Sequence, residues 1–64
     1  MFVNGVLHTL EEPVSLKSFL EREGYNLTKI ATEMDGQIVS KSLYENTIIY
    51  DSTQLEVVSF VGGG

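Results

Sequence analysis

The stretch IATEMDGQIV, residues 30–39, decides the fold of this 64-residue chain. Its first five residues alternate in polarity, so Ile30, Thr32 and Met34 point to one side of a strand and the residues between them point to the other. Asp35-Gly36 follows and tolerates the positive φ angles of a two-residue hairpin turn. The next three residues supply a second strand. The stretch therefore predicts an antiparallel hairpin with one buried face.

A short amphipathic helix is predicted before this hairpin. Ser15 stands at the N-cap position, and Leu16, Phe19 and Leu20 follow at the i, i+3, i+4 spacing of one buried stripe. Gly24 suits the left-handed position that ends many helices. These residues predict about two helical turns that bury one side.

A second hairpin is predicted at the N-terminal end. Asn4-Gly5 lies between β-forming residues and predicts strands over residues 1–3 and 6–10. Either alternating set of the second strand could face the core, and the sequence leaves that register open. The two sets are Val6, His8 and Leu10, or Leu7 and Thr9.

The C-terminal half supplies a crossover and further strands. Residues 40–46 predict a single helical turn or an irregular connection, and the apolar run 48–50 follows. Residues 54–61 predict the last strand after a turn at residues 51–53. The order of these elements predicts an α+β fold, in which a small mixed sheet has one helix packed across one face.

The composition indicates one small domain without disulfide bonds. A 42% hydrophobic fraction is ordinary for a globular protein, and the chain has no cysteine. We expect one domain over residues 1–61, followed by a flexible glycine tail over residues 62–64. No apolar run approaches the roughly 20 residues that cross a bilayer. We therefore expect a soluble, cytoplasmic protein with no membrane partner.

The charge balance argues against nucleic acid as a partner. The net charge is −5, and the four basic residues are scattered singly along the chain, whereas a phosphate backbone is bound by clustered basic residues. A basic protein surface is the more compatible partner. The basic residues are Lys17, Arg22, Lys29 and Lys41.

Groups that could carry catalysis do not converge in the sequence. His8 is the only histidine, and we interpret it as a half-exposed strand residue. The acidic pairs fit solvated loops or strand edges, and no glycine-rich phosphate loop with a following lysine occurs. We therefore expect no catalytic residue, no metal site and no enzymatic activity of the chain itself.

Three consecutive glycines, Gly62, Gly63 and Gly64, follow Val61 at the end of the sequence. Glycine has the largest backbone entropy to lose, so we expect an extended, flexible tail. Without side chains, Gly62 and Gly63 can thread a narrow channel into the active site of another protein. The α-carboxylate of Gly64 is ionised at pH 7 and can attack the α-phosphate of ATP once a partner positions it. A frayed end without function is the alternative.

A docking patch is predicted beside this tail. If Leu55 and Val57 face the helix, Val58 and Phe60 face outward, and Phe2 of the first strand joins them. An exposed apolar patch of this kind is typical of an interaction surface. The alternative is that these residues are simply covered.

Short motifs in a fixed order span nearly the whole chain: Val3-Asn4-Gly5, Ser15-Leu16, residues 30–39, Asp51, and residues 55–58 running into residues 61–64. Together they resemble the ThiS family, the sulfur carrier proteins of thiamine biosynthesis. The resemblance implies the ubiquitin-like β-grasp fold. It also implies that a ThiF-type adenylyltransferase activates the carboxylate of Gly64, and that sulfur replaces the adenylate to give a thiocarboxylate.

The same resemblance implies the later partner and the cofactors. A ThiG-type thiazole synthase receives the sulfur, which enters the thiazole moiety of thiamine. ATP and magnesium belong to the activating enzyme, so this chain is expected to hold no cofactor. It acts as a carrier and co-substrate of its partner enzymes.

Two departures from the family pattern bear on the partner. The chain has Ser40-Lys41 where members commonly have Pro-Arg, and Asp51-Ser52-Thr53 where they tend to have Asp-Gly-Asp. Three alternatives therefore stay open: a carrier like the small subunit of molybdopterin synthase, a ubiquitin-like protein modifier, and an interaction module whose tail has no chemical role.

Overall fold

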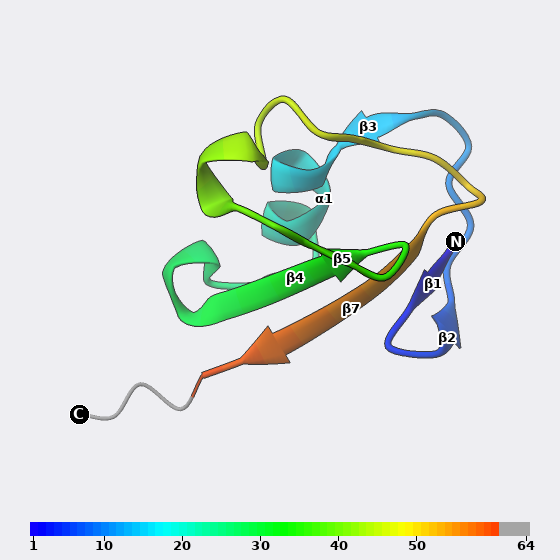
Figure 1. Cartoon of the computed structure of the whole chain (residues 1–64). Helices are drawn as coiled ribbons and strands as arrows, with labels where there is room; N and C mark the ends of the chain where they lie inside the picture. Colours follow the sequence, from blue (N-terminus) through cyan, green and yellow to red (C-terminus); the bar gives the residue numbers. More distant parts are fainter. Residues whose placement is uncertain (61–64) are drawn as a thin grey trace.

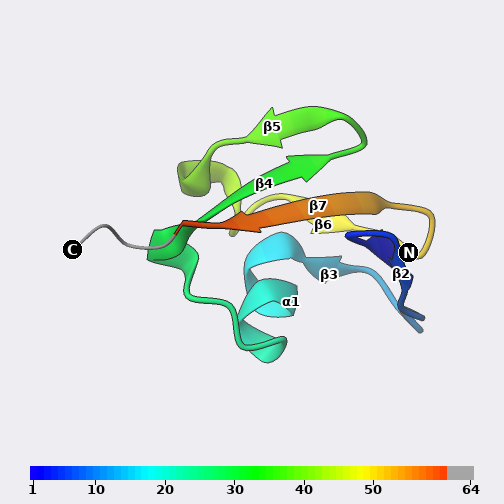
Figure 2. The ribbon, with the colours of Figure 1, turned by 90° about the horizontal axis from the view of Figure 1, so that it is seen from below.

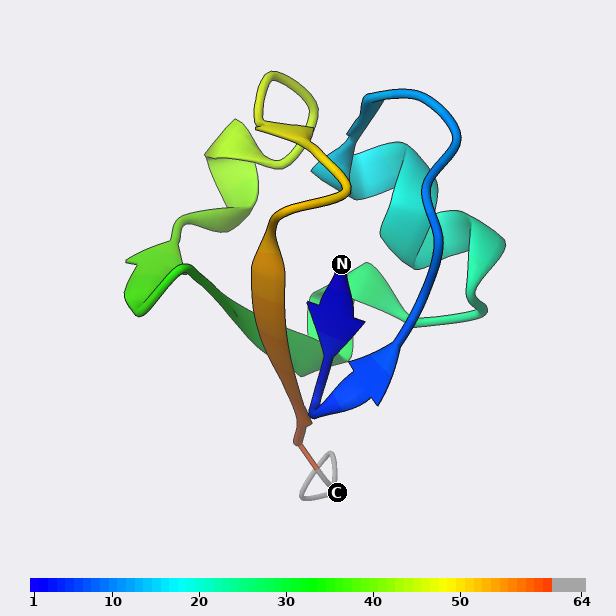
Figure 3. The same ribbon diagram turned by 90° about the vertical axis from the view of Figure 1, so that its right-hand side faces the viewer.

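A mixed sheet of five strands forms one layer of the computed structural model, which describes residues 1–60 (Figure 1). The strands are β1 (Phe2–Val3), β2 (Val6–Leu7), β4 (Ile30–Met34), β5 (Gln37–Val39) and β7 (Gln54–Ser59). Their order across the sheet is β2-β1-β7-β4-β5. β1 and β7 are parallel and lie side by side (Figure 3), whereas the other neighbouring strands are antiparallel.

Helix α1 (Leu16–Arg22) forms the second layer, across one face of the sheet (Figure 2). It starts as predicted, because the hydroxyl oxygen of Ser15 accepts a 3.0 Å hydrogen bond from the Ser18 amide. It ends in a Schellman motif, in which the amides of Gly24 and Tyr25 donate to the carbonyls of the last turn. Gly24 has a φ of +88°, as this motif requires, so both helix boundaries are confirmed.

Short elements complete the helical layer. Strands β3 (Val14–Ser15) and β6 (Ile48–Ile49) form a separate two-stranded sheet that the sequence did not predict as a pair. The 3-10 helix η1 (Leu27–Lys29) leads from α1 into β4. The 3-10 helix η2 (Lys41–Leu43) is the single turn predicted in the crossover between the second hairpin and the last strands.

The core lies between α1 and the sheet. The predicted helix stripe is buried, and the alternation in β4 and β7 brings apolar side chains against it. The largest fully buried side chains are Phe19, Leu16, Leu20, Ile30, Ile49, Leu55 and Thr32. The hydroxyl of Tyr44 donates a 3.0 Å hydrogen bond to the buried hydroxyl of Thr32, so both polar groups are satisfied inside this core.

Both predicted hairpin turns are confirmed by their backbone angles. Asn4 and Gly5 have φ values of +51° and +81°, and Asp35 and Gly36 have +50° and +87°. Positive φ at both central residues is the requirement of the type I′ turn, which matches the twist of the flanking strands. The predicted α+β arrangement of a small mixed sheet with one helix is therefore confirmed.

The N-terminal strands are shorter than predicted. The second strand ends at Leu7, not at residue 10, because the chain turns inward and the Leu10 amide donates to the carboxylate of Asp51 over 2.9 Å. Leu10 is buried, whereas Val6 and Leu7 are both exposed, so neither alternating set fills the core. His8 consequently lies beyond the strand in which it was expected.

The last strand ends at Ser59, which pairs with Ile30 at the start of β4. The pairing between β7 and β4 stops at Ser59 because β4 begins at Ile30. One further hydrogen bond follows, in which the Phe60 amide donates to the Lys29 carbonyl over 2.7 Å. The predicted strand end at Val61, the boundary of the domain at that residue and the glycine tail lie outside the described residues.

Candidate interaction surface

One face of the sheet carries no helix and is called the outer face here. Cross-strand partners point to the same side of a sheet, so the register defines its members. Val58 pairs with Ala31, Glu56 pairs with Glu33, and Glu33 also pairs with Ile38. Phe2 pairs with both Leu7 and Gln54 on the same side. Together these eight residues make up the outer face.

The three predicted docking residues are exposed. The exposed fractions of Phe2, Val58 and Phe60 are 45%, 58% and 50%. Val58 and Phe60 lie together at the C-terminal end of β7, whereas Phe2 lies level with Gln54, four residues and about 13 Å further back along that strand. Sequence reasoning therefore places these side chains outside correctly but joins two separate apolar groups into one patch.

Sequence reasoning missed two further apolar members of the outer face. Ile38 is 79% exposed. Together with Val58, it lines a small hollow on the outer face. Leu7 pairs with Phe2 and extends the other apolar group to the edge of the sheet. The signal for Ile38 was present in the Asp35-Gly36 turn, because a two-residue hairpin sets Ile38 opposite Glu33.

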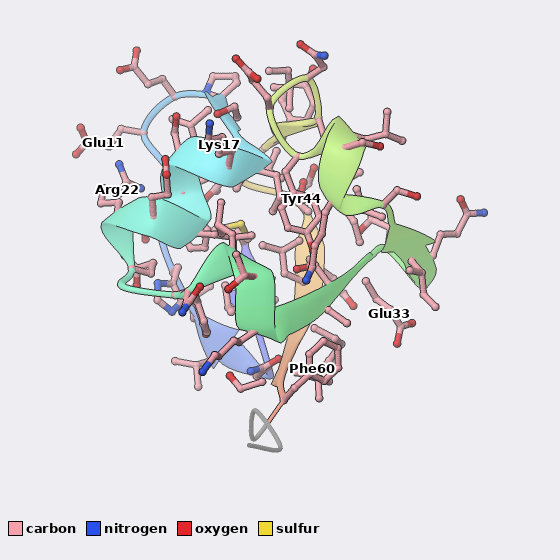
Figure 4. The ribbon with its side chains drawn as sticks, turned by 90° about the vertical axis from the view of Figure 1, so that its left-hand side faces the viewer. Glu11, Lys17, Arg22, Glu33, Tyr44 and Phe60 are labelled. Carbon is pink, nitrogen blue, oxygen red and sulfur yellow. The ribbon has the colours of Figure 1, made fainter. Side chains whose placement is uncertain are left out.

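Phe60 is held where the chain leaves the sheet. Besides the amide bond to Lys29, the ammonium of Lys41 lies 5.8 Å from the centre of the Phe60 ring. The same ammonium donates a 3.1 Å hydrogen bond to the Thr28 carbonyl. Figure 4 shows Phe60 at the base of β7, on the opposite side of the sheet from α1. These contacts hold Phe60 against η1 and η2.

Side-chain chemistry does not converge elsewhere among residues 1–60. The Nδ1 atom of His8 lies 3.9 Å from a carboxylate oxygen of Glu23, and its ring packs edge-on against Phe19. This contact borders a surface hollow of about 450 Å³. Within the described part of the chain, no three acidic, histidine or cysteine side chains gather as a metal site.

The second large hollow lies between α1 and η2. Its volume is about 420 Å³, and its lining includes Lys17, Lys41 and Tyr44. The Tyr44 hydroxyl is already engaged in the core, and the Lys41 ammonium is engaged with Thr28 and Phe60. The predicted chemical residues Gly62, Gly63 and Gly64 lie outside the described residues. No helix in the described range 1–60 has the length and apolar character to cross a membrane.

The layers and strand order define the class of protein. A mixed sheet with a parallel central pair, one helix across one face and a bare outer face is a β-grasp domain of the ubiquitin-like kind. The family model "ThiS family" matches residues 1–64. The chain therefore belongs to the ThiS family.

Individual relatives agree with this assignment. A crystal structure of the thiamine biosynthesis protein ThiS from Geobacter metallireducens is similar in fold, with a TM-score of 0.83 and 23% identity over 98% of this chain and 96% of that one. The uncharacterized protein ycf40 of Porphyra purpurea is 32% identical over 97% of this chain and 87% of its own length. A thiazole synthase of Magnetococcus marinus is 34% identical over 97% of this chain but only 19% of its own length.

Proposed function

We propose that this protein is a sulfur carrier that delivers sulfur for the thiazole moiety of thiamine. The observation that carries the proposal is the match of the whole chain to the ThiS family, from the first hairpin to the terminal glycines. The exposed Phe60 supports it, because this anchored apolar side chain lies four positions before the terminal glycine in the sequence, where a partner that acts on Gly64 would dock. A carrier of this kind needs no catalytic side chain, since its reactive group is a main-chain carboxylate.

The proposed chemistry has two steps on Gly64. Its carboxylate oxygen attacks the α-phosphorus of ATP in a ThiF-type adenylyltransferase, which forms the acyl-adenylate and releases pyrophosphate. A hydrosulfide equivalent from a sulfur donor then attacks the carbonyl carbon, and AMP leaves with the electron pair of the broken C–O bond. The product is a thiocarboxylate. ATP and magnesium are bound by the activating enzyme in this scheme.

A ThiG-type thiazole synthase is the proposed acceptor of the sulfur. Two relatives that are named thiazole synthase contain a segment similar to 97% and 100% of this chain, and that segment is about a fifth of their length. A carrier-like segment joined to a thiazole synthase is expected if the two act together. The outer face supplies an exposed surface for such partners.

Intact-mass analysis tests the proposal. The purified chain is incubated with the ThiF-type adenylyltransferase of its host, ATP, magnesium and a sulfur donor. We expect a mass gain equal to the replacement of one oxygen by sulfur at Gly64. A variant that lacks Gly63 and Gly64 is the matched control, and it should fold normally, since its core is complete within residues 1–60, while gaining no mass.

Other outcomes separate the alternatives. Adducts that join Gly64 to lysines of larger proteins would make the chain a modifier. Transfer of the sulfur to a molybdopterin synthase large subunit, and not to a thiazole synthase, would move it to the other carrier pathway. A chain that stays unmodified with every partner would refute the carrier proposal.

A further inference from the structure

Two carboxylates face each other across the middle of the outer face. Glu33 of β4 and Glu56 of β7 are directly opposed in the antiparallel register, and both side chains are exposed. Opposed residues in such a ladder have their Cβ atoms about 5 Å apart, and like charges at this position destabilise the sheet. The chain therefore carries an unfavourable charge pair at the centre of a face that could have held neutral residues.

The rest of the chain leaves this pair uncompensated. Within residues 1–60, no basic nitrogen lies within 4.0 Å of either carboxylate. Lys17 and Arg22 belong to α1 in the other layer. Lys29 ends η1 and makes no ion pair among the described residues. The ammonium of Lys41 is occupied by the Thr28 carbonyl and the Phe60 ring. The only charged members of the outer face are thus two acidic groups.

The surface between the two carboxylates is hollowed. A depression of about 70 Å³ is lined by Glu33 and Glu56, by the apolar residues Ala31, Ile38 and Val58, and by Thr32. It has room for the end of one side chain but is too small for a drug-sized ligand. An arginine or lysine has the matching shape, because its aliphatic stem packs on apolar surface while its charged end reaches polar groups.

We propose that this hollow is a socket for one basic side chain of the protein partner that docks on the outer face. Arginine suits it best, because a planar guanidinium donates along two edges and can bridge two opposed carboxylates. Figure 4 shows Glu33 and Phe60 on the side of the sheet away from α1. The socket is lined by Val58, two residues before Phe60, so it lies close to the C-terminal end of β7. The inference rests on the proposed function for the identity of the partner, the ThiF-type adenylyltransferase.

The proposal predicts opposite effects on stability and on binding. Removal of one carboxylate relieves the repulsion in the free protein, so Glu33→Gln and Glu56→Gln should raise the melting temperature by about 2–5 °C. Each substitution should also weaken binding to the adenylyltransferase roughly tenfold. One cation bridges both carboxylates in this proposal. The fold-loss in binding affinity of the double variant should therefore be far smaller than the product of the fold-losses of the two single variants.

Titration calorimetry and thermal unfolding test these effects. Glu11→Gln is the matched control, since Glu11 is an exposed glutamate that Figure 4 shows beside α1, and it should leave binding unchanged. Binding losses equal to that of the control, or a lower melting temperature in the single variants, would overturn the socket. If the wild-type chain is adenylated while the glutamine variants bind as well as it does, the socket fails and the proposed function stands.

A partner-free probe keeps the two proposals separate. N-acetyl-arginine amide should shift the backbone amide signals of residues 31–33 and 56–58 in the wild-type chain and not in the double glutamine variant. The neutral isostere N-acetyl-citrulline amide should produce no such shifts. Equal responses to both compounds, or none to either, would overturn the socket even if the carrier chemistry is confirmed.

Discussion

Asp51 shows how one exposed residue joins distant parts of this chain. One oxygen of its carboxylate accepts hydrogen bonds from the Leu10 amide at 2.9 Å and from the N-terminal ammonium at 3.4 Å. The Leu10 hydrogen bond, followed by the bond and charge of the ammonium, holds the pKa of Asp51 below its ordinary value. The ionised carboxylate therefore stabilises the turn of the N-terminal segment into the core.

The sign of the pKa shift fixes a dependence of stability on pH. A carboxyl group whose pKa is lowered by folding contributes stability above its unfolded value, near 3.9, and loses that contribution as the pH falls through the folded value. We expect Asp51→Asn to be less stable than the wild type at pH 7. The difference in unfolding free energy between them should shrink as the pH falls below about 4.

Urea unfolding at a series of pH values measures this difference. The matched control is Glu45→Gln, which removes another exposed carboxylate that has no ion pair among residues 1–60. Stability curves for Asp51→Asn and the wild type that run parallel through the acid range would contradict the role assigned to Asp51.

At the scale of elements, the first hairpin is fastened to the central strand by a side chain. The amide group of Asn4 donates to the Val57 carbonyl at 3.1 Å and accepts from the Val57 amide at 2.7 Å, while its own backbone amide donates to Leu55. The asparagine thus pairs with β7 where the two-residue strand β1 has already ended. Asn4, whose positive φ suits the hairpin turn, therefore also extends the hydrogen bonding between the first hairpin and β7.

Replacement of Asn4 by alanine should therefore cost about 2 kcal/mol of unfolding free energy, since two hydrogen bonds are lost and a positive φ is imposed on alanine. Asn4→Gly keeps the turn and loses only the side-chain bonds, so it should be less destabilised. Asn46→Ala, at an exposed asparagine in the crossover, is the control. Chemical denaturation that finds Asn4→Ala as stable as Asn46→Ala would remove the fastening role.

The elements that sequence predicts well are those set by neighbouring residues. The Asp35-Gly36 turn, the Ser15 cap and the Gly24 ending each depend on local backbone chemistry, and all are confirmed. The β3–β6 pair and the bonds of Asn4 to Val57 join residues 33 or more positions apart. Two-residue strands carry too little pattern to reveal such pairings, so only the fold supplies them.

At the scale of the whole molecule, the candidate interaction surface is a face of the sheet rather than a cluster of reactive groups. Alternation along β7 predicts that Val58 and Phe60 point outward, and the structure places them there. The separation of Phe2 from them, and the opposition of Glu33 to Glu56, follow from the register between strands. A single sequence does not fix that register, which is why the acidic centre of the outer face was not predicted.

Phe60, which follows the strand β7 of the outer face, gives a prediction for the whole molecule. Phe60→Asp should weaken binding to the adenylyltransferase roughly tenfold or more, because it places a charge at the apolar exit of the chain. The fold should persist, since Phe60 is half exposed and its new carboxylate lies beside Lys41. Calorimetric binding and circular dichroism on the same samples measure both properties.

Tyr50→Asp is the matched control, since Tyr50 is 53% exposed and belongs to the turn between β6 and β7, away from the outer face. Equal binding losses in the two aspartate variants would show that added negative charge, not the site of Phe60, is responsible. An unfolded Phe60→Asp variant would instead assign this side chain to the core.

The parallel pairing of β1 with β7 has a mechanical consequence. Both strands run in the same direction from the level at which Phe2 meets Gln54, and β7 is also bonded along its other edge to β4. A tensile force applied to the chain beyond Phe60 therefore acts along β7, across the hydrogen bonds on both of its edges. Those bonds are loaded together in shear instead of opening one after another. We therefore expect the sheet to resist tension applied at the C-terminal end of β7.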